Sequence, residues 1–365
     1  MLFRSLSASV RSSDTVCRQG GDEFVILLEI EHVEDAMFSA QKILAALMVP
    51  YHIDLLEIHV TASIGISLYP DDGQDADTLI KNADTAMYQA KARGRNNYHF
   101  FEQAMNIRAV ERHVIESGLR YALERQEFVL HYQPKINLLS GAIIGVEALI
   151  RWQHPERGLL LPVHFVPIAE DSSLILPIGR WVLREACLQA RAWLEEGLPP
   201  ITVAVNTSAL EFRAKDFIEN IRATLEETGL EPGYLELELT ESVLMHDAES
   251  TSSVLHTLAE LGVKLAVDDF GTGYSSLSYL RQFPIHTLKI DQSFVNDMTR
   301  NSGDATLVGA VISMGKSLNH HVIAEGVETA EQYAFLLDQK CDEGQGYYFS
   351  RPVAAEAFAT LLRAS

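Results

Sequence analysis

The aspartate pair Asp268-Asp269 follows the apolar run Leu265–Val267 and precedes the glycine-containing turn GTGYSS. Neighbouring carboxylates repel each other, and the repulsion grows next to a buried strand. Divalent cations relieve this repulsion. Two such ions, about 3.5–4 Å apart and bridged by carboxylates, suit in-line displacement at phosphorus. The pair therefore predicts a metal-binding position at the end of a core strand.

Comparable polar residues follow other short apolar runs of the chain. In sequence order these are Glu147, Asn206, Glu238, Asp268 with Asp269, Lys289, Glu325 and Gln345. Ordinary structural roles remain open for single positions: Asn206 as a helix cap, Glu238 as an outward-facing strand residue, and Lys289 as the partner of a solvated acid. Five carboxylates at one rim would repel each other unless cations bound between them. Because these positions include no Cys or His, their oxygen donors favour Mg²⁺ or Mn²⁺ over zinc.

The elements that must position these residues are short strands alternating with amphipathic helices. The candidate strands are FVLHYQPKI, IIGVEALIRW, ITVAVNTS, LELELT, VKLAVDD, HTLKID, HVIAEGVE and the segment around GQGYYF. This alternation predicts a (β/α)₈ barrel, in which functional groups lie at the carboxyl ends of the strands. Only the segment NLLSGA joins the first two strands, whereas a parallel crossover needs about a dozen residues or more. We therefore expect a modified TIM-like barrel whose first strand is antiparallel.

Charge limits the ligands that the chain can bind. The net charge of −21 disfavours nucleic-acid polymers and anionic lipid surfaces. Five carboxylates also carry more negative charge than two divalent ions neutralise, so an anionic phosphodiester needs further cations. Lys289 and Arg151 are the candidates.

Length and composition are those of an ordinary globular protein with two domains. The 365 residues are 47% hydrophobic and 22% charged. No apolar run approaches the roughly 20 residues of a membrane span, and the start of the sequence lacks a signal-peptide apolar region. The three cysteines, Cys17, Cys187 and Cys341, are widely spaced and form no CxxC motif. This spacing indicates reduced thiols and a cytoplasmic location.

Two parts of the chain differ in their pattern of predicted strands and helices. Residues 1–101 combine the hairpin-like DTVCRQGGDEFVILLEI with a helical run at 33–48, the strand VTASIGISLYP and a second helical run. Residues 102–125 have helical periodicity, and residues 102–113 of this stretch are expected to form a linker. Residues 114–365 carry the barrel pattern. The sequence thus predicts a partial α/β domain, a helical linker and a barrel domain.

The barrel part resembles the EAL domain, the family of cyclic-di-GMP phosphodiesterases. The resemblance covers residues from about 114 to 362 and rests on seven motifs in the family's order: EALIRW at 147–152, NTS at 206–208, ELTES at 238–242, DDFGTGYSSL at 268–277, KID at 289–291, AEGVE at 324–328 and QGY at 345–347. It implies hydrolysis of one phosphodiester of cyclic-di-GMP to linear 5′-pGpG. It also implies two Mg²⁺ or Mn²⁺ ions per site and a homodimer formed through this domain.

The resemblance also assigns roles to individual residues. The implied metal ligands are Glu147, Asn206, Glu238, Asp268, Asp269 and Glu325. The implied catalytic set is Glu147, Lys289, Glu325 and Glu328, in which Lys289 contacts the attacking water. The implied substrate contacts are Gln133, Leu149, Arg151, Asp291 and Gln345. The turn GTGYSS is implied to order the site with the help of Glu241 and Ser275, although an ordinary strand-to-helix connection capped by Ser275 also explains it.

The stretch RQGGDEFVILL resembles the signature of GGDEF domains, the diguanylate cyclases. Gly20-Gly21 suits a tight turn between two strands. Asp22 and Glu23 then have access to a metal or base, and Phe24 completes the signature. Further similarity lies in VTASIGIS and NADTAMYQAKARGRNN. Arg11 and Asp14 have the spacing to this signature that the family uses for a product-binding site.

Compared with the family, the sequence before Arg11 is too short to supply about the first half of a GGDEF domain. That half carries the first metal-binding aspartate and the guanine-contacting groups in the family, so we do not expect cyclase activity and expect a regulatory or structural role. Three hypotheses for the whole chain follow: a metal-dependent phosphodiesterase, a receptor that binds cyclic-di-GMP without hydrolysis, or a fragment of a bifunctional cyclase–phosphodiesterase whose longer parent chain has an upstream sensory domain.

Overall fold

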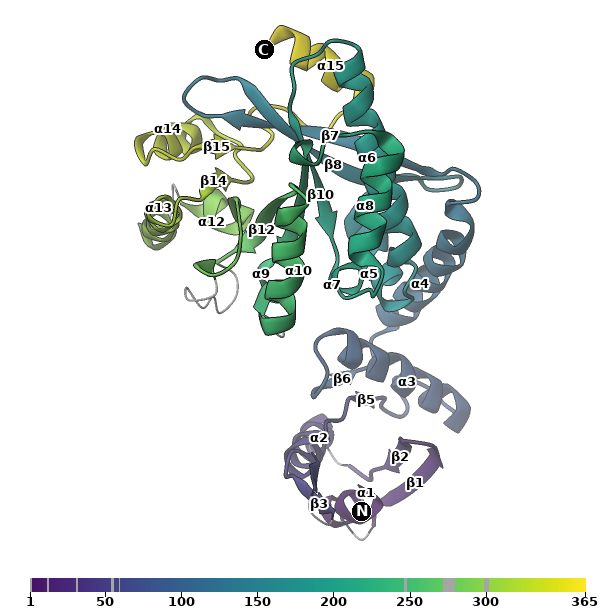
Figure 1. The fold of residues 1–365 in the computed structure, drawn as a ribbon. Helices are drawn as coiled ribbons and strands as arrows, with labels where there is room; N and C mark the ends of the chain where they lie inside the picture. The colour runs from purple at the N-terminus through teal and green to yellow at the C-terminus, as the bar shows by residue number, and fades with distance from the viewer. Residues whose placement is uncertain are drawn as a thin grey trace. The chain divides into compact units, whose positions relative to one another are not determined.

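A computed structural model describes residues 2–11, 13–30, 32–53, 56–58, 60–245, 248–271, 280–298 and 302–365 of the chain. Backbone contacts divide the chain into two compact units, Met1–Ile115 and Glu116–Ser365 (Figure 1). The division falls inside helix α4 (Gln103–Ala122), which lies in the stretch where the sequence predicted helix.

The N-terminal unit is a small α/β assembly of short elements. They are α1 (Leu2–Ser9), β1 (Thr15–Gly20), β2 (Glu23–Leu27), α2 (Val33–Leu47), β3 (Tyr51–Ile53), β4 (Leu56–Ile58), β5 (Ile64–Ile66), α3 (Ala76–Ala92) and β6 (Tyr98–Phe100). Strands β1 and β2 form the expected antiparallel hairpin, while β5 and β6 pair in parallel. Gly65 permits the close packing of α3 on β5, because a Cβ there would lie 1.8 Å from the carbonyl oxygen of Ala83.

The C-terminal unit is a closed barrel of eight strands. Their bounds are β7 (Phe128–Asn137), β8 (Ile143–His154), β10 (Thr202–Thr207), β11 (Leu235–Thr240), β12 (Lys264–Phe270), β13 (Thr287–Ile290), β14 (His321–Ala324) and β15 (Glu343–Gly344). The ring closes because β10 pairs with both β8 and β11, and β15 pairs with β7. Strand β7 is antiparallel to both neighbours and the other pairs in the ring are parallel, which confirms the modified barrel.

Helices follow the strands and cover the outside of the barrel. They are α5 (Pro162–Asp171), α6 (Ile175–Glu195), α7 (Ala209–Phe212), α8 (Phe217–Thr228), α9 (Glu241–Met245), α10 (Ala248–Glu260), α12 (Gln292–Asp297), α13 (Ser302–Ser317), α14 (Ala330–Asp338) and α15 (Ala355–Ala364). Strand β9 (Gly158–Leu160) extends the sheet beside β8, and a 3₁₀ turn, η1 (Pro232–Tyr234), precedes β11. Local signals set several boundaries: Thr329 caps α14, and Gly229 ends α8 in the left-handed conformation.

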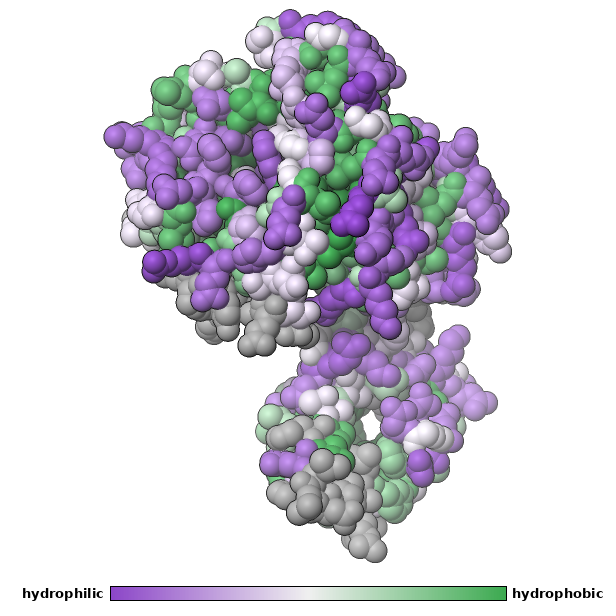
Figure 2. Space-filling model, viewed as in Figure 1, coloured by the Kyte–Doolittle hydropathy of each residue, from purple (hydrophilic) through white to green (hydrophobic). Residues whose placement is uncertain are grey.

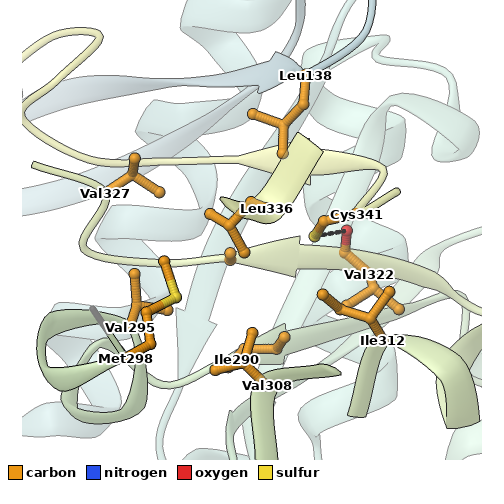
Figure 3. Packing of buried hydrophobic residues seen from close by; sticks show 11 residues of the cluster. Leu138, Ile290, Val295, Met298, Val308, Ile312, Val322, Val327, Leu336 and Cys341 are labelled. Atoms are coloured by element: carbon orange, nitrogen blue, oxygen red, sulfur yellow. Dashed lines mark hydrogen bonds between the residues drawn. The ribbon is translucent and has the colours of Figure 1, made fainter. Parts of the chain in front are cut away.

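The hydrophobic core lies between the strands and these helices. Figure 3 shows one part of it, where Ile290 and Val322 from the barrel face apolar side chains of α13 and α14, among them Ile312 and Leu336. Cys341 belongs to this cluster and its thiol donates to the carbonyl oxygen of Val322 at 3.4 Å. The barrel wall is therefore stabilised mainly from its outer side.

Alternation along β11 separates an outer apolar face from an inner charged face. Leu235, Leu237 and Leu239 are fully buried. Glu236 and Glu238, the residues between them, are also buried and share one ammonium group as an ionic partner. Since side chains alternate across a strand, both glutamates point into the barrel. This placement excludes the outward orientation that the sequence left open for Glu238.

The last strand lies slightly earlier than the sequence predicted. The prediction centred on GQGYYF, whereas β15 comprises Glu343–Gly344 and the chain turns after Gln345. A glycine at position 346 explains the turn, because a Cβ there would lie 2.1 Å from the carbonyl oxygen of Val327. Gly346 therefore lets the turn after β15 pass close to the backbone of Val327.

The visible surface of both units carries many hydrophilic side chains (Figure 2). Within the ranges that the structure describes, no helix combines the length and the apolar composition of a membrane span.

Candidate active site

The end of β12 presents two acids to the same side of the barrel. Consecutive side chains of a regular strand point to opposite faces. Here Asp269 adopts a left-handed backbone conformation with φ 54°, and the pairing of β12 with β13 shifts register between Val267 and Phe270. This bulge lets both aspartates face the strand ends. One carboxylate oxygen from each of Asp268, Asp269 and Glu325 lies within 4.8 Å of the others.

Lys289 occupies the centre of the acidic residues. Its Nζ atom lies 2.5 Å from Glu238 Oε2, 2.6 Å from Glu325 Oε1, 3.0 Å from Asp268 Oδ1 and 3.8 Å from Glu147 Oε2. The side chain is only 1% exposed. Burial alone would lower the pKa of Lys289, but the surrounding carboxylates raise that pKa well above its usual value. The structure thus holds a buried ammonium ion among four acids.

Amide side chains fix the orientation of Glu147. Asn206 Nδ2 donates to Glu147 Oε1 at 2.6 Å, and Gln345 Nε2 donates to Oε2 at 2.6 Å. Gln345 Nε2 also donates to Gln133 Oε1 at 3.1 Å, and Gln133 lies opposite Glu147 in the β7–β8 pairing. Two amide side chains, from the ends of β10 and β15, therefore bind the two oxygens of one carboxylate.

The acidic cluster around Lys289 contains more negative than positive charge, and this changes the pKa of its members. Burial and the neighbouring carboxylates outweigh Lys289 and raise the pKa of Glu325 to about 8. Burial, with Asp268 and Asp291, raises the pKa of Asp269 to about 6. Glu238 is the exception, because two lysines more than offset its burial and lower its pKa to about 2. The all-oxygen donors of Asp268, Asp269 and Glu325 fit a hard divalent cation such as Mg²⁺ or Mn²⁺.

Residues expected to contact substrate lie beside the acids. Leu149 and Arg151 follow Glu147 at two-residue intervals in β8, which places the three on one face of the strand. Arg151 is only 6% exposed, and burial lowers its pKa. Asp291 caps α12 by accepting from the amide of Ser293 at 3.0 Å. The structure thus brings these residues to the strand ends.

Two expected supporting residues lie further from the centre. Glu328 is exposed, and its backbone amide donates to Gln332 Oε1 at 2.7 Å. Glu241 is buried and its Oε2 atom accepts from the amide of Gly271 at 3.1 Å, where the segment after β12 begins. Ser275 lies outside the described residues.

Comparison with known proteins identifies the barrel. Residues 116–352 match the family model described as EAL domain. The chain belongs to the EAL-domain family. Residues 2–97 match a second family model, described as diguanylate cyclase, GGDEF domain. Both resemblances inferred from the motifs are thereby confirmed.

Several curated proteins are similar along nearly all of the chain. The bifunctional diguanylate cyclase/cyclic di-GMP phosphodiesterase MucR of Pseudomonas aeruginosa is 48% identical over 96% of this chain and 51% of its own length. The cyclic di-GMP phosphodiesterase PdeR of Escherichia coli is 40% identical over 98% of this chain and 54% of its own length. The chain thus spans about half the length of the curated relatives it matches.

Solved structures show the same barrel. The phosphodiesterase PaMucR in complex with c-di-GMP has a TM-score of 0.66 and 46% identity, with coverage of 67% of this chain and 99% of its own. The EAL enzyme Bd1971, in a form that binds cAMP and cyclic-di-GMP, has a TM-score of 0.66 and 34% identity, with coverage of 70% and 69% respectively.

Sequence reasoning missed two charged residues inside the EAL domain, Lys135 and Glu236. Both are buried and contact each other. Both lie within β7 and β11, away from the strand ends to which the sequence pattern pointed. A signal did exist, because LELELT alternates two glutamates with leucines and YQPKI carries a lysine in a strand that is otherwise mostly apolar.

The GGDEF-like hairpin presents its signature at the surface. Gly21 has φ 52°, and its carbonyl oxygen accepts from Arg18 Nε at 2.9 Å. Asp22 and Glu23 are exposed, whereas Phe24 packs against the small core of the unit.

The proposed product site beside this hairpin stays a prediction. Asp14 Oδ2 accepts from the backbone amide of Arg11 at 2.7 Å, and Asp14 Oδ1 accepts from the amide of Glu29 at 3.4 Å. The Asp14 carboxylate therefore helps to order the turn that leads into β1.

Proposed function

We propose that the EAL domain of this chain hydrolyses cyclic-di-GMP to linear 5′-pGpG with the help of Mg²⁺ or Mn²⁺. The observation that supports this most directly is the oxygen-donor cluster of Asp268, Asp269 and Glu325 beside Lys289 at the strand ends. The names of similar proteins agree with it, since PdeR is a cyclic di-GMP phosphodiesterase and PaMucR binds c-di-GMP.

The proposed metal ligands are the cluster acids together with Glu147, Asn206 and Glu238. When bound, two such ions stabilise negative charge at phosphorus and make a water molecule more acidic. Asn206 and Gln345 hold Glu147 in a fixed orientation by donating to both of its oxygens. Glu238 Oε2 points toward the same region, where Lys289 contacts it.

Lys289 is proposed to orient the attacking water. Its ammonium group is buried and contacts Asp268 and Glu325, and the surrounding carboxylates raise its pKa well above the usual value, so it can donate a hydrogen bond to a water held between them. Glu328 is proposed to support this arrangement from the rim. Lys289 is therefore proposed to act on the water and not as a metal ligand.

The proposed substrate contacts are Gln133, Leu149, Arg151, Asp291 and Gln345. The guanidinium of Arg151 lies on the Glu147 face of β8 and suits a bidentate contact to a phosphate. Gln133 Nε2 donates to the carbonyl oxygen of Ser350 at 3.1 Å, which holds this side chain close to the QGY segment.

The test is to incubate the purified chain with cyclic-di-GMP and Mn²⁺ and to separate the nucleotides by chromatography. We expect linear 5′-pGpG to form, EDTA to stop its formation and excess Mn²⁺ to restore it. A chain that binds cyclic-di-GMP but leaves it unchanged would be a receptor. Full activity after exhaustive chelation would overturn the metal-dependent mechanism.

We also infer a homodimer formed through the EAL domain, because the family resemblance implies one. Light scattering on the purified chain measures its mass in solution. A monomeric mass at micromolar concentration would contradict this inference. The cytoplasmic location and the upstream sensory domain stay predictions.

A further inference from the structure

Lys135 is a second buried cation inside the EAL barrel, below the strand ends. It comes from β7, and its side chain is 3% exposed. Its Nζ atom lies 2.8 Å from Glu238 Oε1 and 2.5 Å from Glu236 Oε1. Glu236 Oε2 also accepts from Thr287 Oγ1 at 3.0 Å. Lys135 thus links the acidic site to a polar layer deeper in the barrel.

The two oxygens of Glu238 have different partners. Oε1 accepts a hydrogen bond from Lys135 Nζ, and Oε2 accepts one from Lys289 Nζ. Only Oε2 is directed at the cation that also contacts Asp268 and Glu325. The Glu238 side chain is fully buried. The contact with Lys135 therefore helps to hold the carboxylate in an orientation in which one oxygen faces the strand ends.

Packing alone does not require a lysine at this position. Lys135 lines a cavity of about 280 Å³ together with Glu236, Lys264, His286 and other polar residues near the amino ends of the strands. Gly145 lies beside the lysine stem, since a Cβ there would be in ordinary contact with Lys135 Cδ at 3.5 Å. A lysine that borders a cavity is poorly explained as a space-filling residue.

The positive charge of Lys135 compensates two buried glutamates. Glu236 and Glu238 lie two residues apart on the inner face of β11 and share the Lys135 ammonium group. Without it, two buried carboxylates would lie side by side with one cation fewer between them, which is strongly unfavourable. Glu238 would then turn away from the strand ends, which reduces its value as a metal ligand.

We propose that Lys135 is a positioning residue for the metal site, which holds Glu238 Oε1 and thereby directs Oε2 toward the position where a divalent cation would bind. This inference rests on the proposed function, because it assumes that Glu238 is a metal ligand. It adds a residue that touches neither the metal nor the substrate. Partners of metal ligands typically change metal affinity by about 10–100-fold when they are removed.

The test measures Mn²⁺ binding by titration calorimetry without nucleotide. The informative pair is Glu236→Gln and the double variant Lys135→Met with Glu236→Gln. Both lack the Glu236 charge, so their difference reports the contact between Lys135 and Glu238 without the repulsion of two buried glutamates. Lys264→Met, which removes another lysine from the cavity wall, is the matched control.

We expect the double variant to bind Mn²⁺ at least about tenfold more weakly than Glu236→Gln, and Lys264→Met to bind as the parent does. Melting curves in EDTA show whether each variant is folded. Equal Mn²⁺ affinity of the double variant and Glu236→Gln would overturn the role of Lys135. A parent chain that binds no Mn²⁺ would instead count against the proposed function itself.

Discussion

The substitution Lys289→Met tests whether the EAL site is held together by one buried cation when no metal is bound. Lys289 Nζ lies within 3.0 Å of Glu238, Asp268 and Glu325. Removing one partner of a buried ionic pair typically costs about 3–5 kcal/mol, because the remaining charge is uncompensated. For a domain of this size, 1 kcal/mol shifts Tm by about 2–4 °C, so we expect a decrease of about 6–20 °C in EDTA.

Intrinsic fluorescence measures this change in the barrel alone. The three tryptophans of the chain, Trp152, Trp181 and Trp193, all belong to the EAL domain. Melting is followed at pH 8 in EDTA and again in excess Mn²⁺, which should stabilise Lys289→Met more than the parent because it supplies the missing positive charge. Arg184→Met is the control, since Arg184 forms an exposed pair with Glu227 and such pairs add little stability.

The reasoning would be refuted if Lys289→Met melted in EDTA at the same temperature as Arg184→Met. It would also fail if Mn²⁺ raised Tm equally in Lys289→Met and in the parent. Either result would mean that the acids around Lys289 are not electrostatically dependent on it.

Three further predictions concern other parts of the chain. Glu147→Gln removes a charged oxygen donor from the site and should nearly eliminate hydrolysis of cyclic-di-GMP, whereas the exposed Glu227→Gln should retain the parental rate in the same chromatographic assay. Burial lowers the pKa of His286, so below a pH of about 6.5 the unfolded chain binds more protons than the folded one and stability falls with decreasing pH. His286→Asn, whose side chain can still accept from the amide of Leu265, should lose less Tm between pH 7.5 and pH 5.5; an unchanged slope would contradict this assignment. If the GGDEF-like unit has a product site, calorimetry in Ca²⁺ should detect two classes of cyclic-di-GMP sites, and Arg11→Ala should lose one of them. A single class that Arg11→Ala does not affect would leave the unit with a scaffold role.

The barrel could be predicted because its determinants are local. Alternating strand and helix patterns set the fold class, and the short segment NLLSGA was enough to predict the antiparallel first strand. The strand ends were equally accessible, since a run such as LAVDD marks where the apolar residues stop. The structure places the following residues near one another at the strand ends: Glu147, Asn206, Glu238, Asp268, Asp269, Lys289, Glu325 and Gln345.

Other features depend on register and backbone conformation, which the sequence specifies only weakly. The left-handed conformation of Asp269 decides that both aspartates face the site, but aspartate adopts this conformation in only some contexts. The pairing of Lys135 with Glu236 required knowledge of which face of β7 and β11 points inward. Alternation shows that a strand has two faces without showing which is the inner one.

The inverted strand β7 also determines where the preceding chain joins the barrel. Because β7 runs opposite to its neighbours, its first residues Phe128 and Val129 pair with Trp152 and Arg151, close to the substrate end of β8. Helix α4 packs there as well: a Cβ on Gly118 would lie 2.9 Å from the Trp152 ring, and Glu127 accepts from Trp152 Nε1 at 2.9 Å. In a barrel with a parallel first strand, the incoming segment would join the barrel at the amino ends of the strands, on the side opposite to the acidic cluster. In this chain, α4 instead contacts Trp152, the residue next to Arg151 in β8, so the polypeptide enters the barrel beside the strand end that carries Arg151.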